Sequence, residues 1–171
     1  MEHEERQEDE AHLQLTVRSY SDEVRNQLLT GIAQLARDTS RTFESPQPPE
    51  IAIRDEYTPA VYNDPELTER AVGVFQGIFG ESQVVARAPS MGGEDFGRYG
   101  RELGVPSLLY RVGAQDPEKF KASLKPGAEP LPSLHSSRFA PAPEPTLDSA
   151  IRSLSLLSLD LLAPPTPRGG D

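Results

Sequence analysis

Apolar residues recur along the chain with two periods, and each period predicts a different kind of element. Residues 13–17 alternate apolar and polar side chains, the two-residue period of a strand with one buried face. Ser21 is a suitable N-cap for a helix that follows directly. The apolar face of this helix repeats every three or four residues: Val24, Leu28, Ile32 and Leu35. The proline-rich stretch 46–49 ends this unit, and residues 51–53 predict a second alternating strand.

A second group of elements is predicted after residue 60. Asp64 followed by Pro65 is a strong helix-start signal, and Gly80 is placed to end that helix. Its expected buried stripe repeats with helical spacing: Leu67, Ala71, Val74 and Ile78. Short strands are expected at 84–85 and 107–112, with a short helix over 94–103 between them.

The last third of the chain is predicted to hold a long irregular region and one helix. Residues 113–145 are rich in Pro, Lys and Ser, and a loop of this length in a compact domain is usually functional or disordered. Thr146 is expected to cap the final helix, which Pro164 and the prolines after it end. Its apolar positions lie on adjoining faces: Leu147, Ile151, Leu154, Leu157 and Leu161. The strand, helix and strand expected over residues 13–53 predict half of a small α+β sheet layer.

The bulk composition excludes several classes of partner. The chain has 171 residues, 17 basic and 27 acidic side chains, and a net charge of −10. Nucleic acid and anionic membrane surfaces repel such a chain, so neither is an expected partner. The longest apolar-rich stretch, residues 151–162, is too short and too polar to span a bilayer. The absence of cysteine excludes disulfides and thiolate metal sites and agrees with the expected cytoplasmic location.

Two places in the sequence contain candidate metal-binding or substrate-binding residues. His135 lies in the irregular region, where a scaffold can present a metal ligand, although a lone loop histidine is more often a surface residue. Gly92 and Gly93 allow close backbone approach, and Glu94 and Asp95 could hold a cation or orient a polar substrate. The competing interpretation of this cluster is a tight turn that opens a helix, with its acids at the positive helix end.

Four segments resemble landmarks of the aminoacylase/hippurate hydrolase family of metallopeptidases, and they occur in the family's order. They are Leu-Thr-Val-Arg-Ser-Tyr with Asp-Glu-Val-Arg (15–25), Val-Tyr-Asn-Asp-Pro-Glu-Leu-Thr (61–68), Pro-Ser-Met-Gly-Gly-Glu-Asp-Phe (89–96) and Leu-His-Ser-Ser-Arg-Phe (134–139). The likeness covers residues 13 to 162. Ser137 stands where many family members have proline, which changes the rigidity of the loop and leaves the histidine in place.

The resemblance implies an α/β fold in two parts and a set of site residues. Residues 13–58 would be part of an α+β lid that dimerises, and 59–162 the C-terminal part of an α/β zinc-peptidase-like catalytic domain. Outside the resemblance, the acidic residues predict a disordered tail over 1–12, and the prolines from 164 onward predict a second over 163–171. His135 matches the family's final metal-binding histidine. The expected neighbours of the active site are Gly92, Gly93, Glu94, Asp95 and Asn63. The metal implied is a divalent ion: zinc, manganese or cobalt.

The resemblance also implies a reaction, and the missing motifs limit it. The family hydrolyses the amide bond of N-acyl amino acids and similar small amides, but its other metal ligands and its general-base glutamate have no counterpart here. One imidazole cannot hold a catalytic zinc ion. We therefore expect a C-terminal fragment that is inactive alone, with a homodimer or a complementing N-terminal half as partner. The alternatives are a non-catalytic interaction module, whose unpaired sheet edges bind a partner, or a decayed pseudoenzyme.

Overall fold

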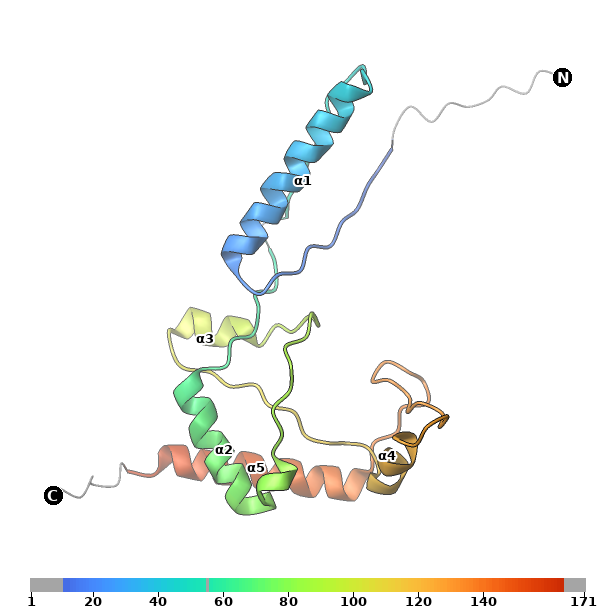
Figure 1. The fold of residues 1–171 in the computed structure, drawn as a ribbon. Coiled ribbons are helices and arrows are strands. Elements are labelled where there is room, and N and C mark those ends of the chain that lie inside the picture. Colours follow the sequence, from blue (N-terminus) through green and yellow to red (C-terminus); the bar gives the residue numbers. More distant parts are fainter. Residues whose placement is uncertain (1–10, 55, 165–171) are drawn as a thin grey trace. The chain divides into compact units, whose positions relative to one another are not determined.

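The described part of the chain is helical, and it divides into two compact units. The computed structural model describes residues 11–54 and 56–164, so the outer parts of both expected tails, 1–10 and 165–171, lie outside it. One unit comprises Met1–Val61 and Pro89–Glu102, and the other comprises Tyr62–Ala88 and Leu103–Asp171. Figure 1 labels the helices in chain order. No described helix is both long enough and apolar enough to cross a membrane.

The first unit is built on helix α1 (Asp22–Thr42), with most of helix α3 (Gly97–Leu103) in its second segment. The predicted cap is confirmed, because the Ser21 hydroxyl accepts a hydrogen bond of 3.2 Å from the Val24 amide. The helix buries Ala33, and Ile53 lies along a shallow groove on that side. Three of the four residues in the predicted apolar stripe are exposed instead, most of all Leu35 at 67%, and Ile32 is half-buried.

The second unit contains the small hydrophobic core. It comprises α2 (Pro65–Phe79), the 3-10 turn η1 (Glu81–Gln83), α4 (Pro117–Ser123) and α5 (Pro143–Leu162). Helix α2 packs on α5, and their contact buries Ala71, Phe75 and Leu157. The Phe75 ring also meets the Tyr110 ring at a centroid distance of 4.8 Å. At the edge of this contact, the Arg70 Nε donates to the Asp160 Oδ2 at 2.6 Å.

The α/β prediction is wrong, because the described residues contain helices and no strand. Residues 13–17, 51–53, 84–85 and 107–112 run outside helices, yet none forms a ladder with another. A two-residue period describes which side chains share a face, but a strand forms only where a second backbone completes its hydrogen bonds. Among the described residues, none makes a backbone hydrogen bond to residues 13–17, and Leu13 is 81% exposed.

Two helix predictions in the last third also require correction. Helix α4 lies within the region predicted to be irregular, and Asp116 caps it by accepting from the Glu118 and Lys119 amides at 3.0 and 2.9 Å. The signal is the same Asp-Pro pair that correctly predicted α2. Helix α5 begins at Pro143 after Ala142, earlier than the expected Thr146 cap, since proline is well suited to a first helical turn.

Candidate functional site

Asn63 is held by two hydrogen bonds to one backbone residue. Its side-chain Nδ2 donates to the Leu109 carbonyl at 2.9 Å, and its Oδ1 accepts from the Leu109 amide at 2.8 Å. The neighbouring Asp64 amide donates to the Ser107 carbonyl at 3.0 Å. The Asn63 side chain thus bonds both backbone groups of Leu109, and the Asp64 amide bonds the Ser107 carbonyl, without a partner strand. In this structure Asn63 connects the start of α2 to the segment predicted as a buried strand.

The cluster at residues 92–95 forms an exposed turn that leads into α3. The Glu94 Oε1 accepts from the Phe96 amide at 3.2 Å, and the Asp95 carbonyl accepts from the Arg98 amide at 3.0 Å. Neither Gly92 nor Gly93 has a positive φ. A Cβ at Gly93 would lie 3.5 Å from the Arg18 guanidinium, an ordinary contact. The geometry therefore agrees with a turn that opens a helix.

His135 lies exposed in a tight turn of the second unit. The turn is closed by the Ser136 amide, which donates to the Ser133 carbonyl at 2.9 Å. The Ser136 hydroxyl then accepts from the Arg138 amide at 3.1 Å. These bonds fix the backbone on both sides of the imidazole. The side chain is accessible to a ligand that arrives from outside the described chain.

The predicted site residues are divided between the two units. Gly92, Gly93, Glu94 and Asp95 belong to the first unit, while Asn63 and His135 belong to the second. Among the described residues, no group of three or more histidines or carboxylates could hold a metal ion. A catalytic zinc ion needs about three protein ligands.

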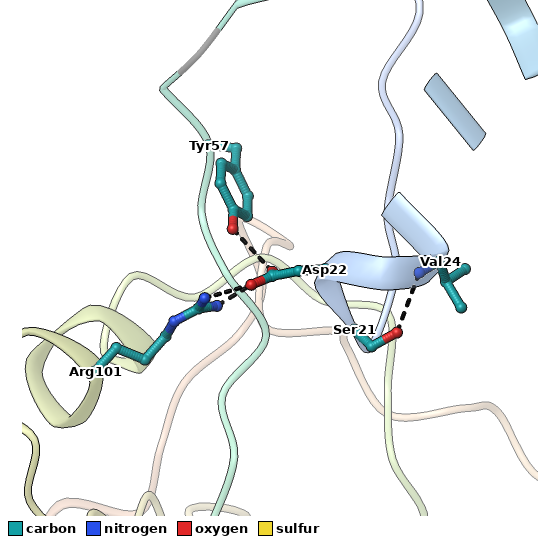
Figure 2. Close-up of polar contacts among 5 residues, drawn as sticks. All are labelled: Ser21, Asp22, Val24, Tyr57 and Arg101. Atoms are coloured by element: carbon teal, nitrogen blue, oxygen red, sulfur yellow. Dashed lines mark hydrogen bonds and ion pairs between the residues drawn. The ribbon is translucent and has the colours of Figure 1, made fainter. Parts of the chain in front are cut away.

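The best-defined polar cluster in the structure is one that sequence reasoning did not predict. Asp22, in the first turn of α1, binds the Arg101 guanidinium through both carboxylate oxygens, one at 3.2 Å, and accepts from the Tyr57 hydroxyl at 2.8 Å (Figure 2). Asp22 is recognisable in the sequence only as an acid that favours the helix N-terminus. Its partners lie 35 and 79 positions away, so no local pattern reveals them.

Asp22 and Arg101 each stabilise the charged form of the other. The Arg101 hydrogen bond, followed by the Tyr57 hydrogen bond, lowers the pKa of Asp22 to about 2. The same ion pair raises the pKa of Arg101. Arg25 places its guanidinium carbon 3.9 Å from the centre of the Tyr57 ring, a cation–π geometry. Arg98 donates to the Tyr57 carbonyl. These contacts fix the loop at Tyr57 between the start of α1 and α3.

In the same unit, the backbone of residues 59–60 lies close against Gly97. A Cβ at this position would lie 2.8 Å from the Ala60 carbonyl oxygen and 3.2 Å from that of Pro59. Both are backbone atoms, which cannot rotate away as a side chain can. Gly97 is therefore required for α3 to pack on residues 59–60. The sequence shows a glycine at the start of a short helix and gives no local sign of this requirement.

No protein-family model matches the chain, and no solved structure matches it.

Proposed function

We propose that this chain contributes the C-terminal part of a metal-dependent amidohydrolase acting on N-acyl amino acids or similar small amides. The observation that carries the proposal is the order of four resembling segments along residues 15–139, because four unrelated matches would seldom fall in the family's order. In this proposal His135 is one metal ligand. Glu94 and Asp95 shape the substrate site together with Asn63.

The described residues provide positioning rather than a complete reaction centre. His135 is exposed in a turn whose backbone is held on both sides, so a metal shared with another part of the protein can reach it. The remaining ligands and the general base would come from a complementing N-terminal half. Alone, the chain is expected to be inactive.

The experiment is a reconstitution with and without that half. The purified chain is assayed with N-acetyl and N-benzoyl amino acids in the presence of zinc, manganese or cobalt, first alone and then with an N-terminal half taken from a family member. Turnover should require both parts and a metal. Turnover by the chain alone contradicts the expected inactivity, and a failure of all supplied halves to bind the chain contradicts the proposal.

A second candidate, an interaction module without catalysis, is favoured by the exposed apolar surface. Leu147, Ile151 and Leu154 on α5 are each about 60% exposed, and Leu28 and Leu35 on α1 are 41% and 67% exposed. Monomeric proteins rarely expose contiguous apolar patches of this kind without a partner. If the chain binds an N-terminal half tightly and the complex takes up no metal, this second candidate accounts better for the chain.

A further inference from the structure

A shallow groove extends along one face of α1 in the first unit. Its volume is about 390 Å³, which lies within the range of small-molecule sites. The helical residues that line it are three or four positions apart, so they share one side of the helix. Ile53, from the segment that follows α1, lines the other side. The lining residues are Asn26, Leu29, Thr30, Ala33, Arg37 and Ile53.

The groove is apolar in its middle and polar at its two ends. Ala33 is 8% exposed, Leu29 is half-buried, and Ile53 is 49% exposed. Asn26 and Arg37 are separated by about 16 Å along the helix axis, since an α-helix rises by about 1.5 Å per residue. A ligand that fills this groove is therefore elongated, with an apolar body and a polar group at one end or both.

The charge of the lining favours an anionic group at the Arg37 end. None of the six lining residues is acidic, although the chain has 27 acidic side chains. Among the described residues Arg37 forms no ion pair, and the neighbouring Asp38 pairs with Arg41 at 3.3 Å instead. A guanidinium presents its donors in the geometry that a carboxylate accepts. The aliphatic stem of an arginine can also extend an apolar wall while its charged head stays in water.

We propose that this groove binds a linear aliphatic carboxylate of medium chain length. The carboxylate pairs with Arg37, and the alkyl chain lies along Ala33, Leu29 and Ile53. Both features are needed, because an alkylammonium ion is repelled by Arg37 and a short polar anion gains nothing from the apolar middle. Since the groove is open to solvent, binding is weak and reversible. This inference concerns the first unit alone and does not require the amidohydrolase proposal.

A series of ligands tests the shape and the charge of the groove. The purified chain is titrated with straight-chain carboxylates of increasing length, each below its micelle concentration, and the methyl signals of Ala33 and Ile53 are followed by NMR. Both signals should shift, and each added methylene should raise the affinity by up to about fourfold until the groove is filled. The alcohol of equal length should bind about two- to fivefold more weakly than the carboxylate, because it lacks the ion pair.

Variants separate the contribution of the charge from that of the apolar wall. Arg37→Gln should weaken carboxylate binding by the same two- to fivefold (about) and leave alcohol binding unchanged, whereas Arg37→Lys keeps the charge and most of the affinity. Ile53→Ala should weaken the binding of both ligands. The matched controls are Arg41→Gln, which removes an arginine that pairs with Asp38, and Leu35→Ala, which removes an exposed leucine of α1 outside the groove. Neither control should change binding.

Three results would overturn the proposal. If neither methyl signal shifts at any ligand concentration below micelle formation, the groove does not bind the ligand. Equal affinities for the carboxylate and the alcohol, or equal losses in Arg37→Gln and Arg41→Gln, would show that Arg37 does not select an anion. If the Ile53 signal shifts with protein concentration in the absence of ligand, a second copy covers the groove and the proposed occupant is wrong.

Discussion

His135 is an exposed imidazole on a turn whose backbone is held on both sides. In a reconstituted enzyme, His135→Ala should reduce bound metal and hydrolysis by at least tenfold, because it removes a direct ligand. His12→Ala is the matched control and should change neither. Bound metal is measured by atomic emission alongside the rate for each variant. If His135→Ala kept full metal occupancy and the full hydrolysis rate, His135 would not be a metal ligand.

Glu94 is expected to act on the substrate and not on the metal. Its carboxylate accepts from the Phe96 amide, which a glutamine side-chain oxygen can still do. Glu94→Gln should therefore preserve the turn and the bound metal while the reconstituted rate falls. Metal content and rate are compared in the same preparations. Equal losses of both would indicate that Glu94 is a ligand instead.

Asp22 should make the stability of the first unit depend on acid pH. Its pKa is lowered from 3.8 to about 2 by Arg101 first and Tyr57 second. A carboxylate with a depressed pKa contributes stability that is fully present above about pH 4 and is lost as the pH falls through 2. By carboxyl NMR titration, Arg101→Gln should raise the Asp22 pKa more than Tyr57→Phe does. An Asp22 that titrates at 3.8 in the unmodified chain would contradict this ion pair.

Substitution of Gly97 by alanine should reduce stability, whereas the same substitution at another helical glycine should not. Gly97→Ala places a methyl group 2.8 Å from the Ala60 carbonyl oxygen, so α3 or residues 59–60 must shift, and we expect a loss of about 1–3 kcal/mol. Gly31→Ala in α1 is the control: no atom lies within 4 Å of its new Cβ, and it should stabilise by about 0.5–1 kcal/mol. Chemical denaturation measures both. A stabilising Gly97→Ala would contradict the close packing.

At the level of elements, the α2–α5 contact provides most of the buried apolar surface. Leu157 is 6% exposed against Ala71 and Phe75, while Leu154, one turn earlier on α5, is 60% exposed. Leu157→Ala should destabilise the second unit by about 2–3 kcal/mol, since it removes buried methyl groups and leaves a cavity. Leu154→Ala should change stability by less than about 0.5 kcal/mol in the monomer. If the two variants lost equal stability in denaturant melts, α5 would pack on α2 through a different face.

Local sequence signals predict where helices α1, α2 and α4 begin. Ser21, Asp64 and Asp116 each accept hydrogen bonds from amides two or three residues later. All three caps are readable from the sequence, although α4 was predicted as part of an irregular region. The apolar stripes are a weaker guide. They indicate which residues share a helix face, but α1 and α5 leave most of those residues exposed.

At the scale of the whole molecule, the buried surface is small for the length of the chain. Within the described residues the buried apolar side chains are Ala33, Ala71, Phe75 and Leu157. Marginal burial and exposed apolar helix faces favour association over a stable monomer. The isolated chain should therefore unfold over a broad temperature range or associate as its concentration rises. A sharp cooperative melt at a strictly monomeric mass would contradict this expectation.

The sequence by itself determined where α1 and α2 begin, because each cap and the hydrogen bonds of a helix close within about four residues. It also pointed to the four segments on which the functional proposal depends. The tertiary structure decided that residues 13–17 and 107–112 are not strands, since a ladder needs a second backbone from elsewhere. It alone brought Asp22 to Arg101 and Asn63 to Leu109. Contacts between residues 79 and 46 positions apart depend on the path of the intervening chain, which no local pattern of side chains encodes.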